Sequence, residues 1–223
     1  ALFSFYLIKT LFYILFRDRE NISLYTEELH NDRDAMTAQY YFRLANFFTS
    51  LAYLDVFQFS NKKKQRLYKK RIIQNQKRML FYAKHSPENF LNKWQLVEAE
   101  RYRVLKKDSE AITYYELSID SARKNGFYME EGLANELACE FWISKNNQNL
   151  ATYYVLEANK AYARWGAFAK VEHLKQKYDE LLRTWDTKGS ASIQASLTQY
   201  TTHGSKLNYS LDIDTIIKAT QTI

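Results

Sequence analysis

Two stretches, AITYYELSIDSARKNG at residues 111–126 and ATYYVLEANKAYARWG at residues 151–166, decide the fold of this chain. They align without a gap at an offset of 40 residues, so alanine meets alanine at the start and glycine meets glycine at the end. Glycine readily adopts the left-handed backbone conformation that follows many helices. Each stretch therefore predicts a helix that ends at its glycine, Gly126 or Gly166.

The same offset of 40 residues joins earlier positions, because Ala99 corresponds to Cys139 and Tyr102 to Trp142. Small residues suit the sites where two helices approach closely, and aromatic rings fill the space beside them. A unit of two helices cannot bury its own apolar face, so such units stack into a solenoid. The alternative is chance matching in a helical chain that is rich in alanine and tyrosine.

The rest of the chain up to about residue 185 also has helical periodicity, with few glycines and one proline, Pro87. Ser86, Pro87 and Glu88 are typical of a helix start. The pattern predicts helices at 2–16, 20–30, 34–56, 61–85, 88–105, 108–125, 128–145, 148–165 and 167–184. The predicted fold class is all-α, a solenoid of antiparallel helix pairs.

Composition divides the chain into three parts. Residues 1–185 form the predicted helical-repeat domain, and residues 186–208 are rich in Ser, Thr, Gly and Gln, which predicts a flexible linker. Residues 209–223 resume a helical pattern and are predicted to form a connector helix to a further domain. Because the chain starts at Ala1 and not at methionine, we expect it to be part of a longer protein.

The N-terminal run at residues 2–16 is mostly apolar but contains Lys9. It is shorter than the roughly 20 apolar residues that a transmembrane helix needs. Its flanking charges follow the run, whereas a signal peptide carries them before it. We interpret it as a buried helix, with a membrane segment as the alternative.

Charge is concentrated in one predicted helix. The 223 residues contain 32 Lys+Arg and 25 Asp+Glu, a net charge of +7. Residues 61–85 contain ten basic and no acidic residues, so the rest of the chain is slightly acidic. The sequence therefore describes a nearly neutral protein with one basic element.

Helical geometry places Tyr68, Ile72, Met79 and Ala83 on one side of this basic helix and most of its charges on the other. The preferred interpretation of the charged side is a solvated outer face. The alternative is a docking surface for nucleic acid, an anionic membrane surface or an acidic protein. The candidate interaction patch consists of Lys63, Arg66, Lys69, Lys70, Lys77 and Arg78.

Patterns for metal binding or catalysis are weak. Glu27 and His30 share i, i+3 spacing, but a di-iron bundle needs a second such pair, and the sequence has none. Glu136 and Glu140 are interpreted as a solvated pair on a repeat helix. The sequence also lacks a phosphate-binding loop and a nucleophile elbow. We therefore expect no catalytic residue, no metal and no cofactor in this segment.

Cys139 is the only cysteine, so no internal disulfide is possible and a reducing compartment is expected. It stands at the repeat position of Ala99, which favours a packing role over a nucleophilic one. The 18 tyrosines, 14 phenylalanines and 4 tryptophans are interpreted as interhelix packing. The alternative for these rings is an aromatic-lined groove for a peptide or a neighbouring domain.

Residues 91–166 resemble tetratricopeptide-like repeats. The resemblance rests on Trp94, Ala99, Tyr102, Ala111, Tyr115 and Ser118, which fall at or near that family's spacing. Two departures are the absent Leu-Gly doublet in the first helix and the absent proline after the second. The unit is also longer than the usual one.

A wider resemblance covers nearly the whole chain. It is similar to the helical segment of large bacterial multi-sensor kinases, which join a Ser/Thr kinase, an AAA/STAND-type ATPase, helical repeats, a GAF domain and a histidine kinase. The matching strings are at residues 5–7, 13–16, 89–91, 96–100, 131–138, 162–167 and 169–171, and 211–221 resembles the helix that leads into the GAF domain.

This resemblance implies a non-catalytic, cytoplasmic scaffold in signal transduction, placed between ATPase and sensor modules. The implied partners are neighbouring domains of the same chain or a protein effector, with no membrane partner. The alternative function is a stand-alone basic adaptor that binds nucleic acid or an acidic protein through residues 61–85.

Overall fold

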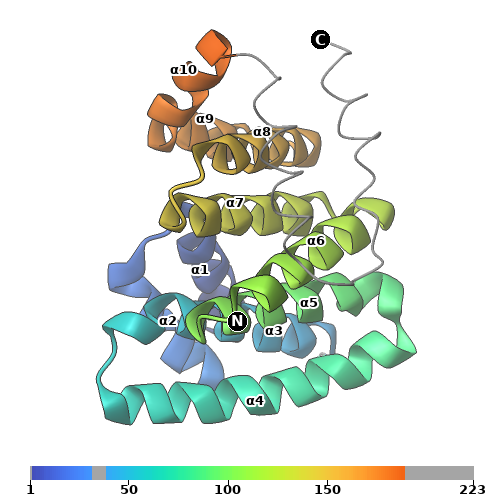
Figure 1. Ribbon diagram of the computed structural model, residues 1–223. Helices are drawn as coiled ribbons and strands as arrows, with labels where there is room; N and C mark the ends of the chain where they lie inside the picture. The colour runs from blue at the N-terminus through green and yellow to red at the C-terminus, as the bar shows by residue number, and fades with distance from the viewer. Residues whose placement is uncertain (1, 32–38, 189–223) are drawn as a thin grey trace.

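The computed structural model describes residues 2–31 and 39–188, which contain α-helices, one short 3-10 helix and no strand. This confirms the all-α fold class. Successive helices pack against one another in layers, from α4 at the bottom of Figure 1 through α7 to α8, α9 and α10 at the top. The helices are α1 Leu2–Phe16, α2 Arg19–Asn31, α3 Gln39–Val56, η2 Phe57–Phe59, α4 Lys62–His85, α5 Pro87–Val104, α6 Asp108–Lys124, α7 Tyr128–Ser144, α8 Gln148–Trp165, α9 Phe168–Lys177 and α10 Asp179–Lys188.

The connections between α5 and α9 repeat one turn at intervals of 20 residues. Lys106, Gly126, Asn146 and Gly166 all have positive φ, between 57° and 81°. After each of them, the next N–H donates a bond of 2.9–3.0 Å to the carbonyl five residues earlier, as in the Schellman motif. The two glycine stops predicted from sequence are confirmed, and the two non-glycine turns between them halve the 40-residue unit.

Packing follows the repeat offset closely in the two central helix pairs. Ala99 and Cys139 are fully buried, and so are Ala111 and Ala151. Helix α5 packs mainly on α6, and α7 packs mainly on α8. Gly132, on α7, lets the two helices of its pair approach closely, because a Cβ there would lie 2.7 Å from the Tyr162 ring.

The predicted single helix at 167–184 is wrong, because the helix breaks at Tyr178 into α9 and α10. The Tyr178 side chain is buried, and its hydroxyl donates a 3.3 Å bond to Glu140 on α7. No glycine or proline marks this break in the sequence. Helix α10 continues to Lys188, three residues past the predicted domain end at 185. The rest of the predicted linker, 189–208, the predicted connector 209–223 and residues 34–38 lie outside the described residues.

Helix α1 has the predicted bounds but is only half buried. Phe3, Leu7 and Ile14 face the core, where α1 packs on α2, α3 and α9. Phe5 and Phe12, on the opposite side, are about half exposed, at 46% and 52%. Within the described residues, no helix combines the length and the apolar character that crossing a membrane requires.

Candidate functional site

Helix α4, which contains the candidate patch, lies along one edge of the molecule and packs on α3 and α5 (Figure 1). The side chain of Asn61 caps its first turn by accepting a 3.0 Å bond from the Lys64 backbone N–H. The first turn contains lysines and no acidic residue. Positive charge at a helix N-terminus opposes the helix dipole, so local stability does not explain these lysines.

The inner face of α4 is the apolar face that the sequence predicted. Tyr68, Ile72, Met79 and Ala83 are all buried, and the Tyr68 ring stacks on Tyr53 of α3 with centroids 4.5 Å apart. This packing fixes which side of α4 faces solvent.

Two buried amides add polar contacts to the same inner face. The Asn75 amide donates 3.1 Å bonds to the hydroxyls of Thr49 and Ser50 on α3. Gln76 donates a 2.8 Å bond to Glu98 on α5. These bonds orient α4 between its two neighbours.

Two arginines of α4 are used by the fold itself. Arg71 donates to the Glu27 carboxylate at 2.7 Å and to the Tyr53 hydroxyl at 2.8 Å. Arg78 is half buried, with its guanidinium 5.7 Å from the centre of the Phe42 ring. Arg78 therefore does not share the exposed setting of the other predicted patch residues.

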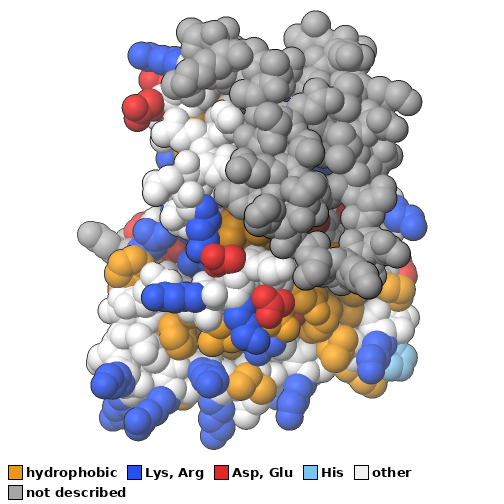
Figure 2. Space-filling model, in the orientation of Figure 1, with side chains coloured by type: hydrophobic (Ala, Val, Ile, Leu, Met, Phe, Trp, Pro, Cys, Tyr) orange, Lys and Arg blue, Asp and Glu red, His pale blue; other side chains and the backbone are white. Residues whose placement is uncertain are grey.

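The other five patch residues, Lys63, Arg66, Lys69, Lys70 and Lys77, are exposed on the outer side of the helix (Figure 2). We define the α4 outer face as these five together with the exposed Lys62, Lys64 and Lys84. Among the described residues, no carboxylate forms a salt bridge with any of these eight cations. The structure thus brings eight unpaired charges together on one helix.

Three apolar side chains also lie on the exposed part of α4, and sequence reasoning missed them. Leu67 is 42% exposed, Ile73 39% and Phe81 59%. Figure 2 shows hydrophobic side chains between the basic ones along this edge. Their positions on the helical wheel, away from Tyr68 and Met79, were the available signal.

A buried ionic cluster joins the end of α1 to α3, α7 and α9, and we call it the α1 clamp. It consists of Arg17, Asp55, Glu136, Glu140 and Lys170. The Arg17 guanidinium donates 2.7 Å bonds to Asp55 and to Glu140. The Lys170 ammonium contacts Glu136 at 2.9 Å and donates a hydrogen bond to the Leu15 carbonyl at the end of α1.

The α1 clamp corrects the interpretation of Glu136 and Glu140 as a solvated pair. Glu136 has no exposed surface, and it also accepts a 3.1 Å bond from the Tyr162 hydroxyl. Burial alone would raise the pKa of Glu140, but Arg17 and Lys177 outweigh it and lower that pKa to about 2. Burial lowers the pKa of Lys170, and Glu136 opposes this shift.

The residues considered for metal or nucleophilic chemistry have structural contacts. The Glu27 carboxylate is paired with Arg71, and the His30 ring lies edge-on to Tyr53 at 6.3 Å. No group of three or more His, Cys, Asp or Glu suited to a metal ion occurs in the described part of the chain. Cys139 is buried, and burial raises the pKa of its thiol.

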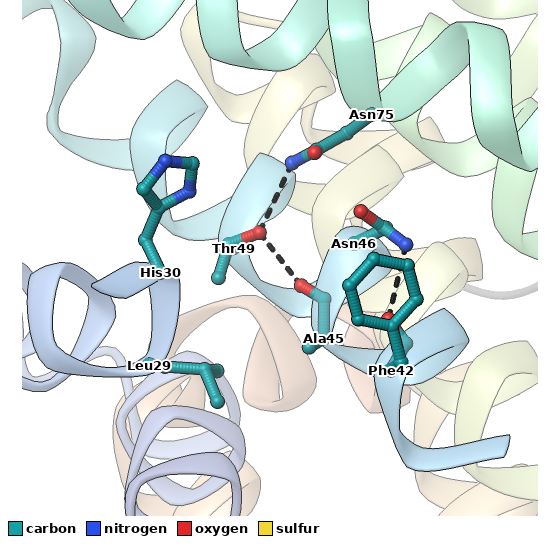
Figure 3. A pocket seen from close by; sticks show the side chains of 7 residues that line it. All are labelled: Leu29, His30, Phe42, Ala45, Asn46, Thr49 and Asn75. Atoms are coloured by element: carbon teal, nitrogen blue, oxygen red, sulfur yellow. Dashed lines mark hydrogen bonds between the residues drawn. The ribbon is translucent and has the colours of Figure 1, made fainter. Parts of the chain in front are cut away.

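A small pocket lies between α2, α3 and α4, and Figure 3 shows His30, Asn46, Thr49 and Asn75 on its wall. Its empty volume of about 190 Å³ is below the roughly 300–1,000 Å³ of typical ligand sites. The Asn75 carbonyl oxygen is buried there without a hydrogen-bond partner among the described residues. This setting suits a water molecule better than a metabolite.

Comparison with known proteins found no matching family model, no matching curated protein and no matching solved structure.

Proposed function

We propose that this chain is a non-catalytic helical-repeat interaction segment, and that its α4 outer face docks on an anionic partner surface. The observation that carries the proposal is the set of eight exposed cations without carboxylate partners on one helix. The lysines in the first turn of α4 support it further, because their position opposes the helix dipole.

The proposal includes a tetratricopeptide-like solenoid built from the helix pairs between α5 and α10. The turns at Lys106, Gly126, Asn146 and Gly166 support this part, because they give successive helices the same turn geometry. A stack of such pairs presents long helix faces to partners, which is the usual role of repeat proteins.

The sequence resemblance supplies the proposed setting, a cytoplasmic multi-domain signalling kinase in which this segment joins an ATPase region to GAF and histidine kinase modules. An acidic surface of a neighbouring domain or of an effector protein would satisfy the charge of the α4 outer face. The coding sequence tests this setting directly. An ATPase encoded upstream and a GAF domain downstream would support it, and the absence of both would overturn it.

Docking by the α4 outer face is tested by titrating the chain against a panel of anionic probes: poly-glutamate, duplex DNA and phosphatidylserine vesicles. Wild type should bind at least one probe, and a variant with Lys63, Lys70 and Lys77 changed to Glu should lose that binding. A control variant with Lys106, Lys124 and Lys175 changed to Glu should retain more of it. Binding to none of the probes, or equal loss in both variants, would refute the proposal.

A second candidate, a stand-alone adaptor for nucleic acid or an acidic protein, rests on the same cations. The DNA and poly-glutamate arms of the panel test it, and the coding sequence separates it from the multi-domain setting.

A further inference from the structure

The arrangement of the lysines is the first clue to the partner of the α4 outer face. Lys63, Lys70, Lys77 and Lys84 are spaced by seven residues and are all exposed. Seven residues bring a helix back to within about 20° of the same side, so these four form a nearly straight row. At 1.5 Å per residue they stand about 10 Å apart, and the row extends for about 30 Å.

The kind of cation on this face is the second clue. Seven of its eight cations are lysines, while Arg71 and Arg78 turn inward to Glu27 and Phe42. Arginine is enriched and lysine depleted where two proteins meet. Lysine suits a diffuse anionic surface, because its flexible stem lies along apolar material while the ammonium stays in water. The composition of the face therefore disfavours a folded protein partner.

The exposed apolar side chains are the third clue. Leu67 and Phe81 flank the lysine row on one side, and Ile73 flanks it on the other. A phosphate backbone offers such side chains no apolar counterpart. A bilayer surface accepts both kinds of group, since apolar side chains enter the headgroup region while lysines contact lipid phosphates.

We infer that the α4 outer face binds the surface of an anionic lipid bilayer, with Leu67, Ile73 and Phe81 entering the headgroup layer and the lysine row contacting acidic headgroups. This inference rests on the proposed docking role of the same face and names its partner. It departs from the sequence-based expectation of no membrane partner, which followed from the resemblance, and a peripheral contact requires no spanning helix. Figure 2 shows that the basic side chains project along an open edge of the molecule, where a flat surface has access to the row.

The charge part is tested by cosedimentation with phosphatidylcholine vesicles that contain or lack phosphatidylserine. Wild type should bind only the anionic vesicles, and binding should weaken as salt rises. Each lysine near an anionic surface contributes about fivefold in affinity. Changing Lys63, Lys70, Lys77 and Lys84 to Gln should therefore weaken binding by at least about 50-fold.

A matched control carries the same change in charge elsewhere, with Lys106, Lys107, Lys124 and Lys175 changed to Gln. All four are exposed and lie outside α4. The control should weaken binding several-fold less than the α4 variant. Equal weakening by the two variants would overturn the inference, because it would show that net charge alone drives the binding.

The apolar part separates lipid from other polyanions. Changing Leu67 and Phe81 to Ser keeps the charge and should weaken vesicle binding by about tenfold. Both side chains are exposed, so the fold should tolerate the change, and circular dichroism checks it. An unchanged affinity of this variant would overturn the inference.

The panel keeps the two levels of proposal distinct. Binding to DNA or poly-glutamate without binding to phosphatidylserine vesicles would overturn the lipid inference and leave the docking proposal standing. Binding to no probe would overturn both.

Discussion

The α1 clamp gives the sharpest prediction about stability, and Lys170 is its most informative residue. The Lys170 side chain is 2% exposed and is paired with Glu136, which is fully buried. Removing one member of a buried ion pair costs about 3–5 kcal/mol, because the other charge stays buried without compensation. Lys177 lies 3.4 Å from Glu136 and offsets part of this cost, so Lys170→Met should destabilise the chain by about 3 kcal/mol.

The cause of that loss is separated by a second substitution. The double variant Lys170→Met, Glu136→Gln removes the uncompensated carboxylate, while the carbonyl oxygen of the introduced glutamine still accepts the Tyr162 hydrogen bond. We expect at least half of the lost stability to return. Lys175→Met is the matched control on the same helix, because Lys175 and Glu172 are both more than half exposed. It should cost less than about 1 kcal/mol.

Urea unfolding followed by circular dichroism at the helix band measures all four proteins. The free energy of unfolding of Lys170→Met should lie well below that of wild type and of Lys175→Met. A loss below about 0.5 kcal/mol in Lys170→Met, or a double variant no more stable than the single one, would refute the view that this ion pair holds α1 on α9.

Three further predictions concern single positions. The pKa of Glu140 is about 2 in the fold against an ordinary 4.5, so about 3 kcal/mol of stability is present above pH 4.5 and lost as the pH falls toward 2; urea unfolding across this range should show the loss in wild type, and an equal loss in Glu140→Gln would contradict it. Gly166→Ala should cost about 1 kcal/mol, because φ there is +81°, and Gly132→Ala about 1–3 kcal/mol, because its Cβ would crowd Tyr162; thermal unfolding compares them, and two neutral changes would contradict the packing described. Lys63→Glu should raise the unfolding free energy by about 0.5 kcal/mol, since it favours the helix dipole, while weakening binding to anionic vesicles; lower stability would contradict this reasoning.

The turns show how much of the fold could be predicted from sequence. Gly126 and Gly166 marked two helix ends because glycine favours positive φ. Lys106 and Asn146 adopt the same conformation, but their side chains do not signal it, so the 20-residue period was missed. The break at Tyr178 was missed for a related reason, since its buried tertiary contact with Glu140 leaves no mark on helical periodicity.

The candidate site was predicted in part for similar physical reasons. Periodicity gave the inner face of α4 correctly, because Tyr68 and Met79 are large apolar residues on one side. The inward turn of Arg78 depends on the Phe42 ring in another helix, which spacing along α4 cannot reveal. The burial of Glu136 likewise depends on Lys170, which is 34 residues away in the sequence.

The central claim is that the α4 outer face is the surface that meets the anionic partner, and a site-specific probe tests it most directly. Cys139 is buried, so a cysteine placed at exposed position 67 by Leu67→Cys is labelled selectively with an environment-sensitive fluorophore. A matched label at Glu172→Cys reports on exposed α9, away from α4.

With phosphatidylserine vesicles, we predict a blue shift for the label at position 67 and none for the label at position 172. Bound protein with no shift at position 67, or with equal shifts at both positions, would contradict the claim.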